Sequence, residues 1–183
     1  LIPFKNYPGL EHSNAPDAKR RAAPYEVGEV KNQLDDLIKK GFEIALHGID
    51  AWYSAEKALL EGERINTVTG RTGIGVRMHW LYYDPQSPMA LEQAGVKYDA
   101  TLGYNETIGY KNGTTQVFKP INVQSLLELP LNIQDTALFY PRRMNLSSVE
   151  AAGLCKVLMD AAHRFGGVLT LSWHDRSLEP ERL

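Results

Sequence analysis

The sequence has only one cysteine, and this scarcity limits the kinds of site that the chain can build. With Cys155 alone, a disulfide framework within the chain and a cysteine-rich zinc site are both excluded. No apolar run approaches the ~20 residues of a membrane-spanning helix, so no membrane partner is expected. The net charge of -2 gives no electrostatic reason to expect nucleic acid as a partner. The single cysteine and the absence of a leader pattern favour the cytoplasm.

Common nucleotide-binding and hydrolase motifs are also missing. No G-x-G-x-x-G opens a predicted helix, and there is no P-loop. No G-x-S-x-G elbow presents a serine nucleophile, and the only thiol lies in a helical pattern without a histidine signature. Activated water is therefore the natural nucleophile for any hydrolysis. No feature of the sequence indicates an oligomeric state.

What the chain does contain is an alternation of predicted strands and helices. The strands are apolar segments at residues 42–47, 72–80, 126–134 and 167–174, with a weaker one at 96–103. The helices lie at residues 25–40, 54–65, 87–95 and 147–165, and Ser147 with Glu150 fits a capping box at the start of the last. This order predicts an α/β fold of parallel strands in one domain, residues 1–183. Because nucleotide-binding motifs are missing, a barrel is favoured over an open doubly wound sheet.

Three of the five histidines fall at the ends of three different predicted strands, namely His47, His79 and His174. Each has one of the three tryptophans nearby, in the order Trp52, Trp80 and Trp173. Asp50 follows the first strand end and Asp135 follows another. Because a parallel barrel gathers functional residues at the carboxyl ends of its strands, these side chains are expected to share a site.

Imidazole and carboxylate ligands together suit zinc or another divalent metal ion. Such an ion polarises a carbonyl group and lowers the pKa of bound water, and a further histidine can protonate a leaving group. Arg77, two residues before His79, is suited to orienting a carboxylate or substrate oxygens. A salt bridge at the rim of the barrel is an equally good interpretation of Arg77.

With these residues, the chain resembles a divergent branch of the NodB-type polysaccharide deacetylases. The resemblance rests on HGIDAW, RMHW, GYNETIGYKNGT, IQDTALFYP and WHDRS, and runs over most of the chain. It implies a distorted barrel of parallel strands and helices. It also implies a metal-dependent hydrolase that removes an acetyl group from an acetamido or acetylated sugar, through attack by metal-bound water.

The family's motifs assign roles to individual residues. His47 matches the first histidine of H-[ST]-x-x-H, but Ala51 stands at the second, so Asp50 is the expected substitute ligand. Arg77 and Trp80 match R-x-P-[YW], with His79 in place of the proline. His174 matches the histidine of L-x-H, the expected general acid. Asp135 is expected to steady this histidine, with Asp99 as the alternative.

The family's first motif, T-F-D-D, supplies the base and a metal ligand, and it does not occur in this sequence. It should lie just upstream of LIPF, so the chain is expected to lack the first strand of the barrel. The residues expected to contact sugar are Trp52, His79, Trp80, Tyr104 and Trp173. Tyr104 lies in a long loop, residues 103–120, which a structured surface crossover would explain equally well.

Two other functions fit the same residues. The chain could be a catalytically inactive barrel that binds carbohydrate through its tryptophans and partners an enzyme. It could also be a hydrolase of another amide or ester bond. The altered second motif, with Ala51 in place of histidine, leaves both alternatives open.

Overall fold

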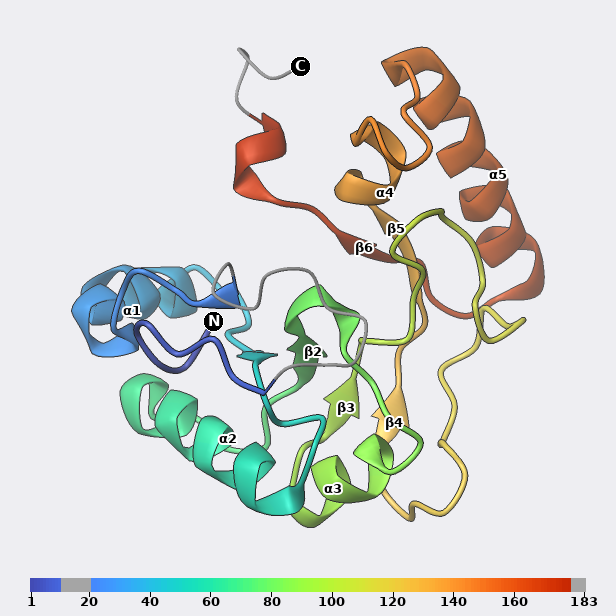
Figure 1. Cartoon of the computed structure of the whole chain (residues 1–183). Coiled ribbons are helices and arrows are strands. Elements are labelled where there is room, and N and C mark those ends of the chain that lie inside the picture. Colours follow the sequence, from blue (N-terminus) through green and yellow to red (C-terminus); the bar gives the residue numbers. More distant parts are fainter. Residues whose placement is uncertain (11–20, 179–183) are drawn as a thin grey trace. The chain divides into compact units, whose positions relative to one another are not determined.

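The structure is a computed structural model that describes residues 1–10 and 21–178 (Figure 1). Its elements, in chain order, are η2 (Val27–Val30), α1 (Lys31–Lys39), β1 (Leu46–Gly48), α2 (Ala55–Thr69), β2 (Val76–Met78), η3 (His79–Leu81), α3 (Ser87–Gln93), β3 (Tyr98–Asp99), β4 (Leu127–Glu128), β5 (Leu131–Gln134), α4 (Asp135–Phe139), α5 (Ser148–Phe165), β6 (Thr170–Ser172) and η4 (Asp175–Leu178). The order confirms the predicted α/β fold.

The chain divides into two compact units, and each is described by itself. Unit 1 comprises Leu1–Thr101 and Lys119–Leu127, and unit 2 comprises Leu102–Phe118 and Glu128–Leu183. The prediction of a single domain over residues 1–183 stays a prediction.

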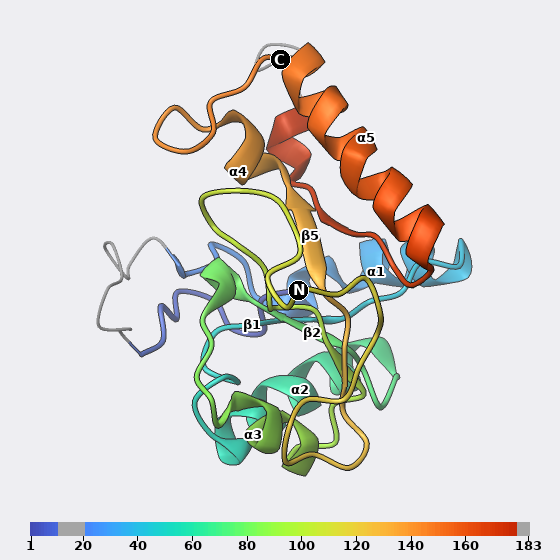
Figure 2. The same cartoon turned by 90° about the vertical axis from the view of Figure 1, so that its right-hand side faces the viewer.

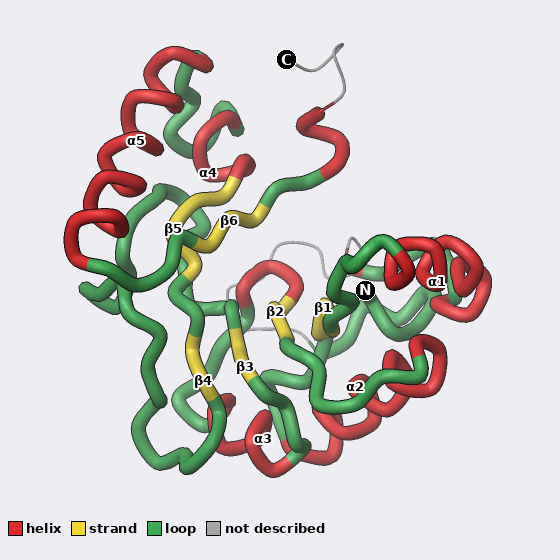
Figure 3. The backbone as a smooth tube through the Cα atoms, turned by 180° about the vertical axis from the view of Figure 1, so that it is seen from behind, coloured by secondary structure: helices red, strands yellow, loops and turns green. Residues whose placement is uncertain are grey.

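Unit 1 is built on short parallel strands. One sheet has the strand order β1-β2-β3-β4, and β2 pairs in parallel with β1 and with β3. The backbone of Leu1 lies beside β1, because its nitrogen donates to the Ala45 carbonyl at 2.7 Å and its carbonyl accepts from the His47 nitrogen at 2.8 Å. Figure 3 shows that the strands of this sheet are short segments within a chain that is otherwise loop and helix. The sheet therefore brings together the ends of β1 and β2. His47 and His79, which are predicted to share a site, lie at these two ends.

Helix α2 shows how local sequence and burial together place an element of unit 1. The Ser54 hydroxyl accepts from the Lys57 nitrogen at its start, and Gly70 ends it in the left-handed conformation, with φ of 67°. Ala58, Ile65 and Val68 face the core. The core of unit 1 joins this helix to the sheet and to α1 and α3 through a cluster that includes Val27, Leu34, Leu46, Ala58, Ile65, Val76, Met78 and Leu91.

Unit 2 contains the parallel pair β5 and β6 with helix α5 alongside (Figure 2). Ile133 of β5 packs with Leu138 and with Ala151 of α5, and partly buried Leu158 adds to this cluster. The capping box at the start of α5 is confirmed: the Ser147 hydroxyl accepts from the Glu150 nitrogen, and the Glu150 carboxylate accepts from the Ser147 nitrogen at 2.9 Å.

The prediction of one strand over residues 126–134 is corrected by the structure. The segment forms β4 and β5, which are separated by Leu129 and Pro130. Proline has no N–H group for a strand ladder, and its ring restricts the residue before it, so regular pairing stops at this point. The short helix α4, which follows β5 directly, was also not expected from the sequence.

The closed barrel is not confirmed. In the described part of the chain the strands form a four-stranded sheet and a separate two-stranded sheet. Strands β3 and β4 are only two residues long, which leaves few backbone groups to continue the ladder. Among the residues described, no helix is long and apolar enough to cross a membrane.

Candidate active site

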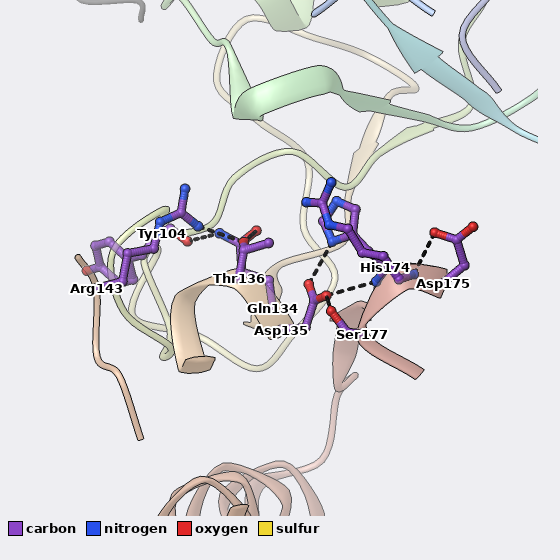
Figure 4. A network of polar contacts seen from close by, with 9 residues as sticks. Tyr104, Gln134, Asp135, Thr136, Arg143, His174, Asp175 and Ser177 are labelled. Atoms are coloured by element: carbon purple, nitrogen blue, oxygen red, sulfur yellow. Dashed lines mark hydrogen bonds and ion pairs between the residues drawn. The ribbon is translucent and has the colours of Figure 1, made fainter. Parts of the chain in front are cut away.

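The predicted site residues form two groups, one in each unit. The group in unit 2 contains His174 and Asp135. Asp135 follows β5 and begins α4, while His174 follows β6 by two residues. Because β5 and β6 are parallel neighbours, their carboxyl ends bring the two side chains to the same edge. The Asp135 Oδ1 and His174 Nδ1 atoms lie 2.7 Å apart (Figure 4).

The Asp135 carboxylate accepts three hydrogen bonds. Besides the ring contact, Oδ2 accepts from the His174 backbone nitrogen at 3.1 Å and from the Ser177 hydroxyl. Burial alone would raise the pKa of Asp135, but the hydrogen bonds from His174 and Ser177 outweigh it and lower this pKa to about 2. The carboxylate is therefore charged at neutral pH and acts only as an acceptor.

The charged carboxylate determines which nitrogen of His174 is available for chemistry. Since Asp135 can only accept, Nδ1 of His174 carries a proton and Nε2 is the atom that exchanges protons with a substrate. The Asp135 side chain is fully buried, whereas that of His174 is 39% exposed. A buried carboxylate that orients a partly exposed imidazole is an arrangement used for general acid–base catalysis.

A pocket of about 500 Å³ lies beside this pair. Its lining comprises Phe139, Tyr140, Leu146, Ser147, Ser148, Arg176 and Ser177. Ser177 connects it to Asp135, and Phe139 contacts the predicted Trp173 at 5.9 Å between ring centroids in an edge-on arrangement. The indole is 40% exposed, so its predicted role in sugar binding is compatible with its position.

Tyr104 enters the neighbouring polar network through its backbone. Its carbonyl accepts from Gln134 Nε2, and the Gln134 Oε1 atom accepts from the Thr136 hydroxyl at 3.2 Å (Figure 4). The Thr136 hydroxyl in turn accepts from Arg143 Nη1 at 2.6 Å. Arg143 is thus held by a hydrogen bond within unit 2. A sugar contact by the Tyr104 ring stays a prediction.

The group in unit 1 is built around His47 and His79. Their ring centroids lie 4.8 Å apart, and the planes are inclined by 62°. The Nδ1 atom of His47 lies 3.0 Å from the carbonyl oxygen of Arg77, its register partner on β2. Burial, followed by the neighbouring His79 ring, lowers the pKa of His47 well below its ordinary value, so this imidazole is neutral at pH 7.

The predicted tryptophans of unit 1 lie around Tyr82. Its ring centroid is 5.9 Å from that of Trp52 and 6.3 Å from that of Trp80. Trp80 also lies 5.6 Å from the His79 ring and has a positive φ of 63°, an uncommon conformation for a bulky residue. Trp52 is buried, which is the position of a core residue. Sugar contacts by these rings and by His79 stay predictions.

Asp50, the predicted metal ligand, is fully buried and already hydrogen-bonded at both oxygens. Oδ2 accepts from the Tyr7 hydroxyl at 2.5 Å, and Oδ1 accepts from the Leu10 nitrogen at 2.8 Å. The Asp50 nitrogen donates to Glu61 Oε1 at 2.7 Å. These contacts tie the loop after β1 to the first residues of the chain. Metal binding by Asp50 stays a prediction, and it would have to compete with them.

Arg77 and Asp99 lie together in the interior of unit 1. The Arg77 Nε atom donates to the Ala100 carbonyl at 3.0 Å, and burial lowers the pKa of Arg77. Burial also raises the pKa of Asp99 to about 6, although a hydrogen bond from the Thr101 hydroxyl opposes this. Of the two aspartates considered for the contact with His174, Asp135 is the one for which the structure shows it.

The described residues provide fewer metal-binding side chains at one place than a zinc site usually has. Among residues 1–10 and 21–178, no three histidine, cysteine, aspartate or glutamate side chains converge so as to hold a metal ion. The neutral imidazole of His47, with Nδ1 held by a carbonyl, nevertheless has the chemistry of a metal ligand.

Two sets of hydrogen bonds at the candidate site residues were not expected from the sequence. Ser177 completes the hydrogen bonds of Asp135, and Glu61 accepts from the backbone nitrogens of Ile49 and Asp50. A weak signal existed for each. Ser177 lies three residues after His174 in the polar stretch WHDRS, and Glu61 lies on the helical face that also carries Ala58 and Ile65.

No family model and no curated protein matches this chain. Among solved structures, the chain is similar to a crystal structure from Mycobacterium smegmatis provisionally named a polysaccharide deacetylase, with a TM-score of 0.59 and 20% sequence identity. The match covers 86% of this chain and 58% of the other, so the chain spans a little over half of that protein. The likeness shows that this chain has a deacetylase-like α/β fold.

Proposed function

We propose that this chain is a hydrolase of the polysaccharide-deacetylase type, which removes an acetyl group from an acetamido or acetylated sugar. The observation that supports this most directly is the contact between the buried, charged Asp135 and the partly exposed His174. The fold shared with the Mycobacterium smegmatis protein supports the same class of reaction.

In the proposed reaction, His174 is the general acid and Asp135 is its positioning residue. Asp135 holds the ring by Nδ1, so that Nε2 donates a proton to the sugar nitrogen or oxygen as its bond to the acyl carbon breaks. The pocket beside Ser177 offers a tyrosine and an arginine to the sugar, and Trp173 offers an exposed ring face nearby.

A divalent metal ion, zinc by its preference for imidazole, is part of the proposal. His47 would hold it, with Asp50 as the second ligand suggested by sequence, and Arg77 would help position the base or substrate. The ion would supply polarisation of the acyl carbonyl and activation of water. The sequence predicts that His47 and His174 belong to one site. Because His47 lies in unit 1 and His174 in unit 2, this stays a prediction.

A catalytically inactive carbohydrate-binding protein is the second candidate. The observation that favours it concerns Asp50, the expected metal ligand. One of its oxygens accepts a hydrogen bond from the Tyr7 hydroxyl and the other from the Leu10 nitrogen. On this alternative the rings of Trp80 and Trp173 bind sugar, and a partner performs the chemistry.

Acetate release separates the two candidates. The purified chain is incubated with zinc or cobalt and with N-acetylglucosamine oligomers or O-acetylated xylan, and free acetate is measured enzymatically. Release that exceeds the protein-free control supports the hydrolase. Saturable oligosaccharide binding without any release of acetate supports the binding protein.

A further inference from the structure

Two arginines of unit 2 lie over the ring of Tyr140. The chain turns back at this residue, because the Arg143 nitrogen donates to the Tyr140 carbonyl at 2.9 Å and Pro141 lies between them. The guanidinium carbon of Arg143 is 5.4 Å from the centroid of the Tyr140 ring. Arg176, from η4, reaches the same ring, and its guanidinium carbon is 5.8 Å from the centroid. Two positive charges therefore gather at one aromatic ring.

Neither of these guanidinium groups forms an ion pair with a carboxylate of residues 1–10 and 21–178, where the ion pairs involve other cations. The Nη1 atom of Arg143 donates to the Thr136 hydroxyl (Figure 4), which uses one of the five N–H donors of this side chain. Two like charges near one ring repel each other, so an anion that contacts them is stabilised.

The carboxylates nearest to this place in the sequence are held by hydrogen bonds of their own. The Asp175 Oδ1 atom accepts from the Arg176 backbone nitrogen at 2.8 Å. The Glu150 Oε2 atom accepts from the Ser147 nitrogen at 2.9 Å and from the Ser147 hydroxyl at 2.7 Å. The Asp135 side chain is fully buried. These groups contribute negative charge, but none neutralises either guanidinium group by direct contact.

The pocket of about 500 Å³ gives an anionic group on a sugar room to reach Arg176. Tyr140, Arg176 and Ser177 are among its lining residues, and its volume lies within the roughly 300–1,000 Å³ that is usual for ligand sites. Ser177 also donates to Asp135, which contacts His174. A sugar chain in this pocket therefore passes beside the proposed general acid.

The chemistry of the guanidinium group favours a carboxylate as its ligand. Its N–H groups lie in one plane and form a fork that matches the two oxygens of a carboxylate, and it stays charged at neutral pH. An aromatic ring below the plane leaves these N–H groups directed outward from the edge of the guanidinium. A uronic acid presents such a carboxylate on its ring, where a neutral hexose has a hydroxymethyl group.

We propose that this pocket binds the carboxylate of a uronic acid, so that the substrate of the chain is an acidic polysaccharide. Arg176 contacts the carboxylate in the pocket, Arg143 adds a second positive charge, and the Tyr140 ring lies under both guanidinium groups. The inference rests on the proposed function for the bond that is hydrolysed, and it names the class of sugar chain that carries this bond.

Two oligosaccharides that differ only in the acidic group test the proposal. Cellotetraose and the glucuronic acid tetramer with the same linkage differ only in the carboxylates that the second one carries. Isothermal titration calorimetry measures the binding of each to the unaltered chain and to R176Q, R176K, R143Q and R164Q. Arg164 lies over the Phe165 ring but is not among the lining residues, so R164Q is the matched control. Far-ultraviolet circular dichroism checks that each variant is folded.

The unaltered chain should bind the glucuronic acid tetramer about tenfold more tightly than cellotetraose, as an order-of-magnitude expectation for a hydrogen-bonded charge pair. R176Q should remove most of this preference, and R176K should keep part of it, because lysine retains the charge without the fork. R143Q should reduce the preference by a smaller factor, since Arg143 is not among the lining residues, and R164Q should leave it unchanged.

Equal affinity for the two tetramers, an unchanged preference in R176Q, or an equal loss in R164Q would each overturn the proposal. Tighter binding of cellotetraose that is sulfated at its primary hydroxyls would overturn the assignment to a carboxylate. Failure of the proposed function looks different: the acidic tetramer binds through Arg176, but neither its acetylated form nor an acetylated neutral sugar releases acetate.

Discussion

His47 in unit 1 and His174 in unit 2 occupy equivalent places in the sequence pattern, yet they have different partners. Each lies at or just after the carboxyl end of a strand in a parallel pair. The His47 Nδ1 atom meets a backbone carbonyl, and this ring lies beside a second imidazole. The His174 Nδ1 atom meets a buried carboxylate, and its ring is partly exposed.

The end of a strand thus provides a position for each histidine, while the group that contacts its Nδ1 atom determines the chemistry that the ring can perform. A carbonyl fixes the tautomer of His47 without adding charge, which suits an uncharged metal ligand. A carboxylate orients His174 and places a negative charge behind it, which suits proton transfer. The units also differ in their buried carboxylates, since the pKa of Glu61 is raised to about 7 and that of Asp135 is lowered to about 2.

The largest expected effect concerns His174. H174A should lower kcat for acetate release by about 10²–10⁴-fold with little change in KM, because a general acid acts mainly in the transition state. The measurement is steady-state kinetics with the acetylated substrate that the unaltered chain accepts best. H163A, which removes an exposed histidine of the same unit, is the control and should be unchanged. Equal rates for H174A and H163A would contradict the assigned role.

A second effect distinguishes the buried carboxylates through pH. Burial raises the pKa of Glu61 above its ordinary 4.5 to about 7. The hydrogen bonds that its carboxylate accepts from backbone N–H groups lower this pKa, but burial has the larger effect. Its contribution to the free energy of unfolding is therefore fully present below pH ~4.5 and is lost as the pH rises through 7, by an amount on the order of 3 kcal/mol.

Urea unfolding at pH 5 and pH 8 measures this contribution when the chain is compared with E61Q. The unaltered chain should lose more stability between these values than the variant, which has no titrating group at position 61. Asp99 and His47 titrate in both proteins, so their effects cancel in the difference. Parallel pH dependences for the two proteins would contradict the raised pKa.

The smallest effect is expected from S177A, which sharpens the description of the unit 2 pair. Losing the hydroxyl removes one of three hydrogen bonds to Asp135, so the pKa of Asp135 should rise and the free energy of unfolding should fall by about 1 kcal/mol. Carbon-13 NMR titration of the carboxyl group and thermal unfolding measure these changes. S148A, at an exposed serine of α5, is the control. No shift in the Asp135 titration would show that Ser177 contributes nothing.

Local signals in the sequence predicted local structure well. Ser147 and Glu150 lie three residues apart and form the predicted capping box, because all the contacts needed are within one turn of helix. The resemblance suggested Asp135 as the residue beside His174, with Asp99 as the alternative, and the structure shows the contact between Asp135 and His174. The break at Pro130 and the helix α4 after β5 were missed, because the apolar pattern continues through both.

Contacts between distant residues could not be predicted in the same way. Asp50 lies three residues after His47, as a substitute ligand would, yet Tyr7 and Leu10 occupy its oxygens. Nothing in the spacing of these residues indicates that the start of the chain folds over the loop after β1. The contact of His79 with His47 likewise depends on the register of β1 against β2.

Local patterns in the sequence were enough to predict most of the helices and strands, and to show that imidazole and carboxylate groups follow several strands, because periodicity and capping act over a few neighbouring residues. The open sheets of the described residues, the hydrogen bonds that occupy both oxygens of Asp50 and the contact of Asp135 with His174 became known from the folded structure alone. Those outcomes depend on strand register and on which buried polar atoms find partners, and both are set by residues far apart in the chain.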